Sequence, residues 1–132
     1  MSTYLRFQSR LPCQRTQRPM GIFAAAGVVE ELPELDVNIR DRLAESLTWF
    51  NRNLKVPPLS SNGWRCLFWF RSDARQFINR IWDLTTILNE TGVYVKKLWT
   101  TDPGMIVYSD RYQIGAVPHS RRRRNRPRIG AS

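Results

Sequence analysis

The sequence predicts an α+β fold in which a small mixed sheet of about four to five strands is covered by helices, mainly on one face. The chain of 132 residues is long enough for one hydrophobic core. Apolar residues make up 42% of it and aromatic residues 11%, which is typical of a folded chain. Segments with apolar residues at helical spacing predict helices, and short apolar runs between them predict strands. The predicted order is β-α-α-β-α-β-β-β.

The N-terminal segment predicts one short strand followed by a loop. Residues 3–7 alternate β-branched or aromatic with other residues, which is typical of a strand. Residues 9–19 are polar and basic and contain Pro12 and Pro19, which lack a backbone donor. We therefore expect a basic loop at 9–19.

Three helices follow from apolar spacing and end signals. Residues 20–32 are small and apolar at helical spacing, and Pro33 ends that helix. Asp36 is placed to cap a second helix, which runs to residue 54. Ser72 or Asp73 is placed to cap a third helix, which runs to Glu90 and stops at Thr91 and Gly92. The apolar stripe of the second helix is Ile39, Leu43, Leu47, Phe50 and Leu54, and that of the third is Phe77, Ile81, Leu84 and Leu88, broadened by Ile78 and Trp82.

The remaining strands are predicted from apolar runs between turn residues. The run at 65–70 is continuously apolar after its first residue, as in a central strand covered on both faces. Residues 93–100, 105–109 and 112–117 predict three strands in meander order. The helix between the strands at 65–70 and 93–100 is long enough for a parallel crossover.

Charge is concentrated at the two ends of the chain. The formal net charge is +10, yet residues 20–118 carry 11 basic and 11 acidic residues and are formally neutral. We therefore divide the chain into a single α+β domain at 1–118, with a Pro, Ser and Gly linker at 56–63, and an arginine-rich tail at 119–132. Electrostatic attraction to a polyanion is expected to act through the basic arms.

The tail and the N-terminal arm predict contact with nucleic acid, RNA rather than DNA, by a non-enzymatic binding module. Guanidinium groups grip phosphates and stay charged, so such a tail gives affinity without base specificity. The predicted nucleic-acid-binding residues are Arg121, Arg122, Arg123, Arg124, Arg126, Arg128, Arg10, Arg15, Arg18, Lys96 and Lys97. The alternative without a binding function is a solvated tail that only aids solubility.

Two tryptophans are candidates for stacking on bases or for contacting a partner. Trp64 follows a glycine in the predicted loop, and Trp99 shares a strand with Lys96 and Lys97. The other aromatic residues are needed for a core in so short a chain. An alternative function is a protein–protein interaction component, such as an adaptor, an inhibitor or a small subunit of a larger assembly.

A small hydrolase or nuclease is the third alternative. It would use Asp73, Asp102 and Asp110, although Asp73 is also a cap and the other two stand in turns. The single histidine, His119, begins the tail, where we expect no fixed geometry. No catalytic residue, metal or cofactor is therefore assigned, because the chain also lacks a zinc spacing and a glycine-rich phosphate loop.

Cysteine usage and hydropathy predict a cytoplasmic, reducing environment. Cys13 and Cys66 form no framework, and no run of about 18 apolar residues predicts a membrane span. The first 29 residues are basic and end in an apolar run, which mimics a signal peptide. Because Glu30 and Glu31 continue the helical pattern, we interpret this run as the first core helix.

Overall fold

A computed structural model of the chain describes residues 2–14, 17–55 and 66–119. In chain order its elements are β1 (Tyr4–Pro12), β2 (Pro19–Gly21), α1 (Ile22–Glu30), α2 (Val37–Asn53), β3 (Leu67–Arg71), α3 (Arg75–Glu90), β4 (Val95–Thr100), β5 (Met105–Ser109) and β6 (Gln113–Val117). The α+β class and the order of the predicted elements are confirmed, and β2 is added to them. The predicted linker at 56–63 and the tail from residue 120 lie outside the described residues.

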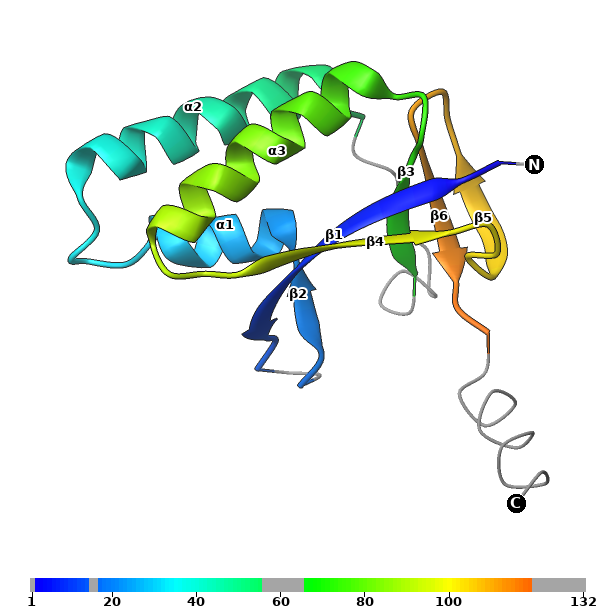
Figure 1. The fold of residues 1–132 in the computed structure, drawn as a ribbon, viewed down its shortest axis with the longest axis horizontal. Helices are drawn as coiled ribbons and strands as arrows, with labels where there is room; N and C mark the ends of the chain where they lie inside the picture. The colour runs from blue at the N-terminus through cyan, green and yellow to red at the C-terminus, as the bar shows by residue number, and fades with distance from the viewer. Residues whose placement is uncertain (1, 15–16, 56–65, 120–132) are drawn as a thin grey trace.

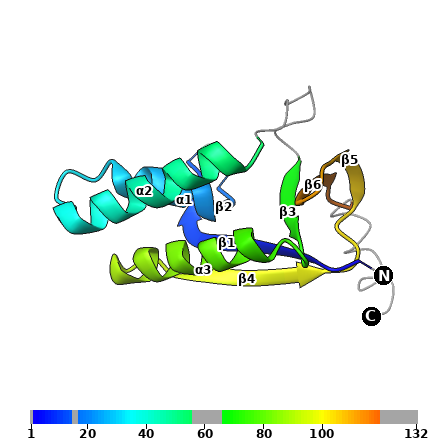
Figure 2. The same cartoon turned by 90° about the horizontal axis from the view of Figure 1, so that it is seen from above.

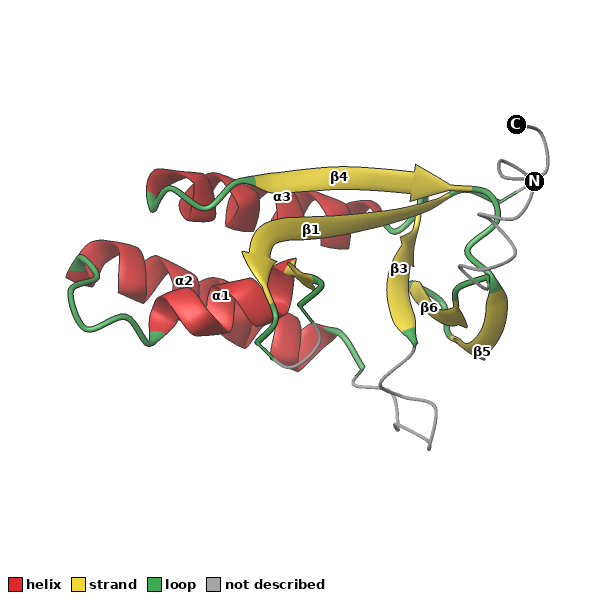
Figure 3. Ribbon diagram, turned by 90° about the horizontal axis from the view of Figure 1, so that it is seen from below, coloured by secondary structure: helices red, strands yellow, loops and turns green. Residues whose placement is uncertain are grey.

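The sheet is organised around β1. On one side β1 pairs with β4, and on the other it pairs first with β3 and then with β2; β6 and β5 continue the sheet beyond β3. Figures 1 and 3 show β1 and β4 running together beside the helices, while β3, β6 and β5 lie across them at the other end. The sheet therefore has a long half covered by helices and a short half beyond them.

The prediction of a mixed sheet is wrong, because every pairing among the described strands is antiparallel. β3 and β4 are each antiparallel to β1, so they run in the same direction, as the helical crossover requires. However, β1 from the start of the chain lies between them. The predicted meander is also wrong in part, since β5 pairs with β6 whereas β4 pairs with β1.

The segment predicted as a basic loop at 9–19 is partly a hairpin. β1 continues to Pro12, and Pro12 faces Pro19 at the loop end of the β1–β2 hairpin. Proline is tolerated at strand ends, where the missing donor costs no ladder hydrogen bond. The Ser9 hydroxyl, buried in this hairpin, donates to the Met20 carbonyl oxygen at 3.0 Å.

The three helices pack on one face of the sheet around Phe77. This α3 side chain is 1% exposed. Its ring centroid lies 5.4 Å from Trp49 on α2, 6.2 Å from Phe70 on β3 and 4.6 Å from Tyr112. A smaller cluster of Tyr4, Trp69, Ile114 and Ala116 lies on the opposite face. Of β3 only Phe70 is fully buried and Trp69 is partly buried on the opposite face, so the prediction that both faces of this strand are covered holds only in part.

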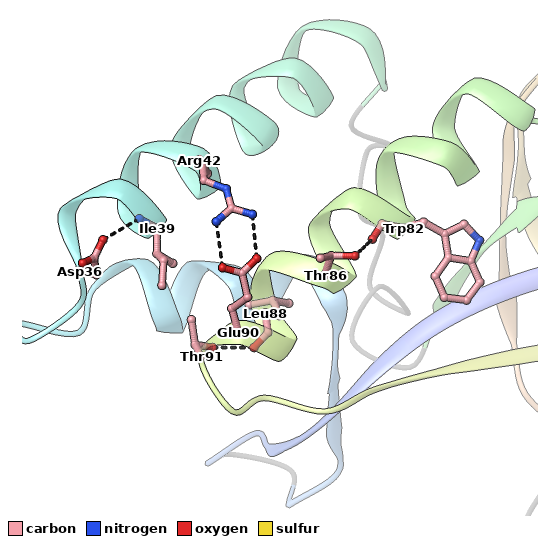
Figure 4. A network of polar contacts seen from close by, with 8 residues as sticks. All are labelled: Asp36, Ile39, Arg42, Trp82, Thr86, Leu88, Glu90 and Thr91. Atoms are coloured by element: carbon pink, nitrogen blue, oxygen red, sulfur yellow. Dashed lines mark hydrogen bonds and ion pairs between the residues drawn. The ribbon is translucent and has the colours of Figure 1, made fainter.

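Polar contacts fix the helix ends (Figure 4). Asp36 caps α2 as predicted, because its Oδ1 accepts the N–H groups of Asn38 and Ile39. After α3, Gly92 adopts a φ of +89°, which confirms the predicted stop. The cap predicted at Ser72 or Asp73 is wrong: α3 begins after Ala74, whose N–H donates to the Arg71 carbonyl oxygen and whose side chain is buried in the core.

Within the described residues, no helix has the length and apolar character needed to cross a membrane.

Candidate functional site

The candidate site is β4, which lies at an edge of the sheet. Among the described strands β4 pairs only with β1, and α3 runs beside it (Figures 2 and 3). Opposite residues of an antiparallel pair project from the same face, and faces alternate along each strand. The register therefore assigns each β4 side chain to a face.

On the face toward the helices, a lysine and two tryptophans gather at the outer edge. Lys97 faces Phe7 across the β1–β4 pair, and Trp99 faces Leu5. Trp82 from α3 packs edge-on against Phe7 at 5.1 Å between centroids, and the Lys97 Nζ lies 5.9 Å from the Trp82 ring centroid. We call Trp82, Lys97 and Trp99 the tryptophan cluster. Figure 4 shows the Trp82 indole reaching from α3 toward β1.

The tryptophan cluster is open to solvent. Trp99 is 66% exposed and Trp82 is 45% exposed, and the Lys97 side chain is exposed as well. A lone exposed apolar residue is ordinary, but Trp99 and Lys97 share one face of β4 and Trp82 lies beside Lys97, which gives a surface both apolar and cationic. This surface offers flat rings for stacking and a charge for an anion.

The opposite face of β4 carries a second pairing of cation and aromatic ring. Arg10 donates its backbone N–H to the Tyr94 carbonyl oxygen at 3.1 Å, and its guanidinium carbon lies 4.9 Å from the Tyr94 ring centroid. Lys96 projects from this same face, opposite Gln8. The β1–β4 pair, together with Tyr94 just before β4, thus presents basic and aromatic side chains on both faces.

The electrostatic character of this edge follows from the sequence. Neither β1 nor β4 contains an acidic residue, whereas together they hold Arg6, Arg10, Lys96 and Lys97. Lysines on an edge strand also discourage pairing with another chain, which is the structural reason for their presence. The edge attracts anions in either case.

The structure brings together only part of the predicted site. Arg10, Lys96, Lys97 and Trp99 meet on the β1–β4 pair, whereas Arg18 is exposed just before β2. Arg15, Trp64 and the tail arginines, Arg121, Arg122, Arg123, Arg124, Arg126 and Arg128, lie outside the described residues. The sequence analysis did not select Tyr94, and it placed Trp82 in the core. The neighbouring Asp83 could have indicated that Trp82 lies on the solvent-exposed side of α3.

The carboxylates proposed for a nuclease do not gather. Asp102 precedes β5 and Asp110 follows it, so this five-residue strand, about 17 Å long, separates them. No group of three metal-ligating side chains occurs within the described residues. The Asp102 carboxylate instead contacts His119 Nε2 at 2.8 Å, which gives His119 the defined geometry that the sequence did not predict.

Asp110 stabilises the turn between β5 and β6 by accepting hydrogen bonds. Burial alone would raise the pKa of Asp110, but hydrogen bonds from the Tyr108 hydroxyl and from the backbone N–H groups of Tyr112 and Gln113 outweigh it and lower that pKa. The pKa of Asp102 is lowered by its hydrogen bond with His119. Both shifts arise from turn and hairpin contacts.

Comparison of the chain with protein-family models, with curated proteins and with solved structures finds no match.

Proposed function

We propose that this protein is a non-enzymatic module that binds single-stranded nucleic acid, RNA in preference to DNA, along β4. The observation that carries the proposal is Trp99, which is 66% exposed next to Lys97 on an edge strand without acidic residues. Bases stack on such rings whatever their sequence, and neighbouring lysines neutralise the phosphates. Unpaired bases are the usual target of RNA-binding sheets, which favours RNA.

The basic arms extend the same function. Arg10 stands on β1 beside Tyr94, and the arginines from residue 121 onward follow β6 in the chain. Phosphate contacts by these arms add affinity without sequence information. The proposal therefore assigns stacking to β4 and most of the salt-dependent attraction to the arms.

The test is fluorescence anisotropy with labelled 12-nucleotide single-stranded and duplex RNA and DNA at two salt concentrations. The full chain is compared with a chain ending at His119, which keeps the Asp102 contact. We expect tightest binding to single-stranded RNA and a steep fall in affinity with added salt. Removing the tail should reduce the salt slope by roughly 0.7 for each phosphate that the tail neutralises. Affinity that does not change with salt would contradict the proposal.

A matched pair of variants separates the β4 edge from net charge. The double substitution Lys96→Gln and Lys97→Gln removes two charges from β4, and Arg52→Gln with Arg111→Gln removes two exposed charges from α2 and the β5–β6 turn. We expect the β4 pair to weaken RNA binding more than the control pair. Equal effects would mean that only net charge matters.

A protein–protein interaction is the second candidate function, favoured by β5 at another edge of the sheet. Met105, Ile106 and Val107 are consecutive, apolar and all more than two-fifths exposed. The register shifts between Ile106 and Tyr108, which bends this strand. If β5 binds a protein, Ile106→Lys should remove a partner recovered with the wild type and leave RNA binding unchanged.

A further inference from the structure

A cavity opens where β1 leaves β3. The two strands pair only at Tyr4 and Leu5, and from Gln8 onward β1 pairs with β2 instead. The opening between β1 and β3 is flanked by the first turn of α1 and the last turns of α2. The cavity measures about 420 Å³, within the range of roughly 300–1,000 Å³ that is typical of small-molecule sites.

The walls of this cavity are mainly apolar. They include Phe23 of α1, Leu47, Phe50 and Leu54 of α2, and Phe68 of β3. Gln113 also lines it, but its side-chain amide already donates to the Lys55 carbonyl oxygen at 2.8 Å and to Asp110. The walls therefore suit an aromatic ring or a short aliphatic chain.

Two cations line this cavity: Lys55, which is exposed to solvent, and Arg6, which is partly buried and has no counter-ion. The Arg6 Nη1 donates to the Phe68 carbonyl oxygen at 3.1 Å, while its Nε is buried and has no acceptor. All eleven acidic residues lie in the described part of the chain, and the ion pairs there involve only Glu90 and Asp102. No carboxylate of the chain thus neutralises Arg6.

The surroundings of Arg6 make this charge costly. Burial lowers the pKa of the Arg6 guanidinium, which still remains charged at neutral pH. A charge that is largely removed from water without a counter-ion is destabilising relative to the same charge when it is paired. A second donor among the lining residues, the Trp69 indole N–H, is also buried without an acceptor.

The start of α1 lies against the same guanidinium. A Cβ built at Gly21 would lie 3.3 Å from Arg6 Nη2, and Gly21, the N-cap of α1, offers no side-chain cap. The unpaired N–H groups of a helix start carry partial positive charge, which adds to that of Arg6. The positive end of the cavity is thus defined by Arg6 and reinforced by the α1 terminus.

We propose that this cavity binds a small monocarboxylic acid with an apolar body, whose carboxylate lies against Arg6 and whose ring or acyl chain packs among Phe23, Phe50 and Phe68. A phosphate suits the cavity less well, because a strongly hydrated dianion would have to enter apolar walls. A carboxylate accepts side by side from one guanidinium. This site is separate from the β4 edge and does not depend on nucleic-acid binding.

The test compares two probes of the same shape, 2-naphthoate and the neutral 2-naphthamide, by isothermal titration calorimetry on the full chain. A hydrogen-bonded charge pair favours naphthoate by about tenfold or more. The Arg6→Met variant should lose this preference, and Arg10→Met, which removes an exposed arginine of the same strand, should retain it. Arg10→Met is expected to weaken RNA binding, so failure of one proposal does not imply failure of the other.

A third variant keeps the test decisive if Arg6→Met does not fold. Ala24 is exposed on the first turn of α1 and lines the cavity, so Ala24→Trp fills the cavity without disturbing the core. It should abolish binding of both probes, with an unchanged circular dichroism spectrum. Equal affinity of wild type for naphthoate and naphthamide, no binding of either, or naphthoate binding unaffected by Ala24→Trp would each overturn the proposal.

Discussion

Replacing Trp99 with alanine should separate binding from folding more cleanly than any other change on β4. The side chain is 66% exposed, so about one third of it is buried. With about 250 Å² for a full indole, that third is about 85 Å², which contributes at most about 2 kcal/mol to the free energy of unfolding. Domains of this size are typically stable by about 5–15 kcal/mol, so Trp99→Ala should stay folded at 25 °C.

The loss in binding should be comparable or larger. Stacking of one base on an aromatic ring contributes roughly 1–3 kcal/mol, which corresponds to an increase in Kd of about 5- to 150-fold. The measurement is anisotropy with single-stranded RNA, alongside urea denaturation to obtain the free energy of unfolding. Trp99→Phe, which keeps a smaller ring, should recover part of the affinity.

Met105 provides the matched control. It is 62% exposed and lies on β5, another edge of the sheet. Met105→Ala should therefore leave RNA affinity unchanged while removing a similar exposed apolar surface. The reasoning is refuted if Trp99→Ala leaves the Kd unchanged in a folded protein, or if Met105→Ala weakens binding by the same factor.

Other substitutions test the packing and the pH response of the fold. A Cβ at Gly115 would lie 2.7 Å from Phe68 Cε1, so Gly115→Ala should lower the free energy of unfolding by about 1–3 kcal/mol. Nothing lies within 4 Å of a Cβ at Gly27 in α1, so Gly27→Ala should instead raise it by about 0.5–1 kcal/mol in the same urea titration. The pKa of Asp110 is lowered in the folded state, so its stabilisation is complete above its unfolded pKa of about 3.9 and is lost as pH falls below that value. Asp110→Asn should therefore flatten the stability profile between about pH 4 and pH 2, and an unchanged slope would argue against the turn network.

The helices were predicted well because their signals are local. Every residue of the predicted α3 stripe, Phe77, Ile81, Leu84 and Leu88, is buried. Asp36 caps α2 because a short side-chain acceptor satisfies the N–H groups just after it in the chain. Helical stripes and caps depend only on residues within one or two turns of each other, so they can be recognised from the sequence alone.

Strand pairing was predicted poorly because it depends on distant segments. The helix between β3 and β4 was expected to form a parallel crossover, and the two strands do run in the same direction, but β1, more than 50 residues earlier, lies between them. The prolines of the 9–19 segment argued for a loop, yet Pro12 and Pro19 stand at strand ends where no ladder bond is required. Nothing in the local sequence indicates which strand accepts β1.

The two candidate sites also differ in how far they could be predicted from the sequence. Lys96, Lys97 and Trp99 are neighbours in the sequence, so their presence on one strand was predictable, although the contribution of Trp82 was not. The Arg6 cavity exists only because β1 exchanges β3 for β2 after Leu5. The sequence around Arg6 does not indicate a cavity, because the cavity depends on which strands pair.

Several other arginines of the described residues make contacts that stabilise the fold, so they are not candidates for ligand binding. Arg40 donates to the carbonyl oxygens of Glu30 and Leu32 at the end of α1, and Arg42 pairs with Glu90 to join α2 to α3 (Figure 4). Arg71 donates to the backbone carbonyl oxygen of Asp110 and to the Ser109 hydroxyl, and these contacts hold the β5–β6 turn. These cations stabilise the fold, so a high content of basic residues is not in itself a binding surface.

Unlike Arg40, Arg42 and Arg71, the side chains of Arg10, Lys96 and Lys97 make no hydrogen bond or ion pair among the described residues. Arg10, Lys96 and Lys97 instead lie beside aromatic rings or project into solvent, and Arg6 faces an apolar cavity. Exposed cations cost little to leave unpaired, since water solvates them, and they are suited to hydrated polyanions. A desolvated cation gains most from one anion that excludes water with it. The two proposals therefore predict different salt sensitivities for the same pair of strands: RNA binding at β4 should weaken steeply with added salt, and carboxylate binding at Arg6 should change little.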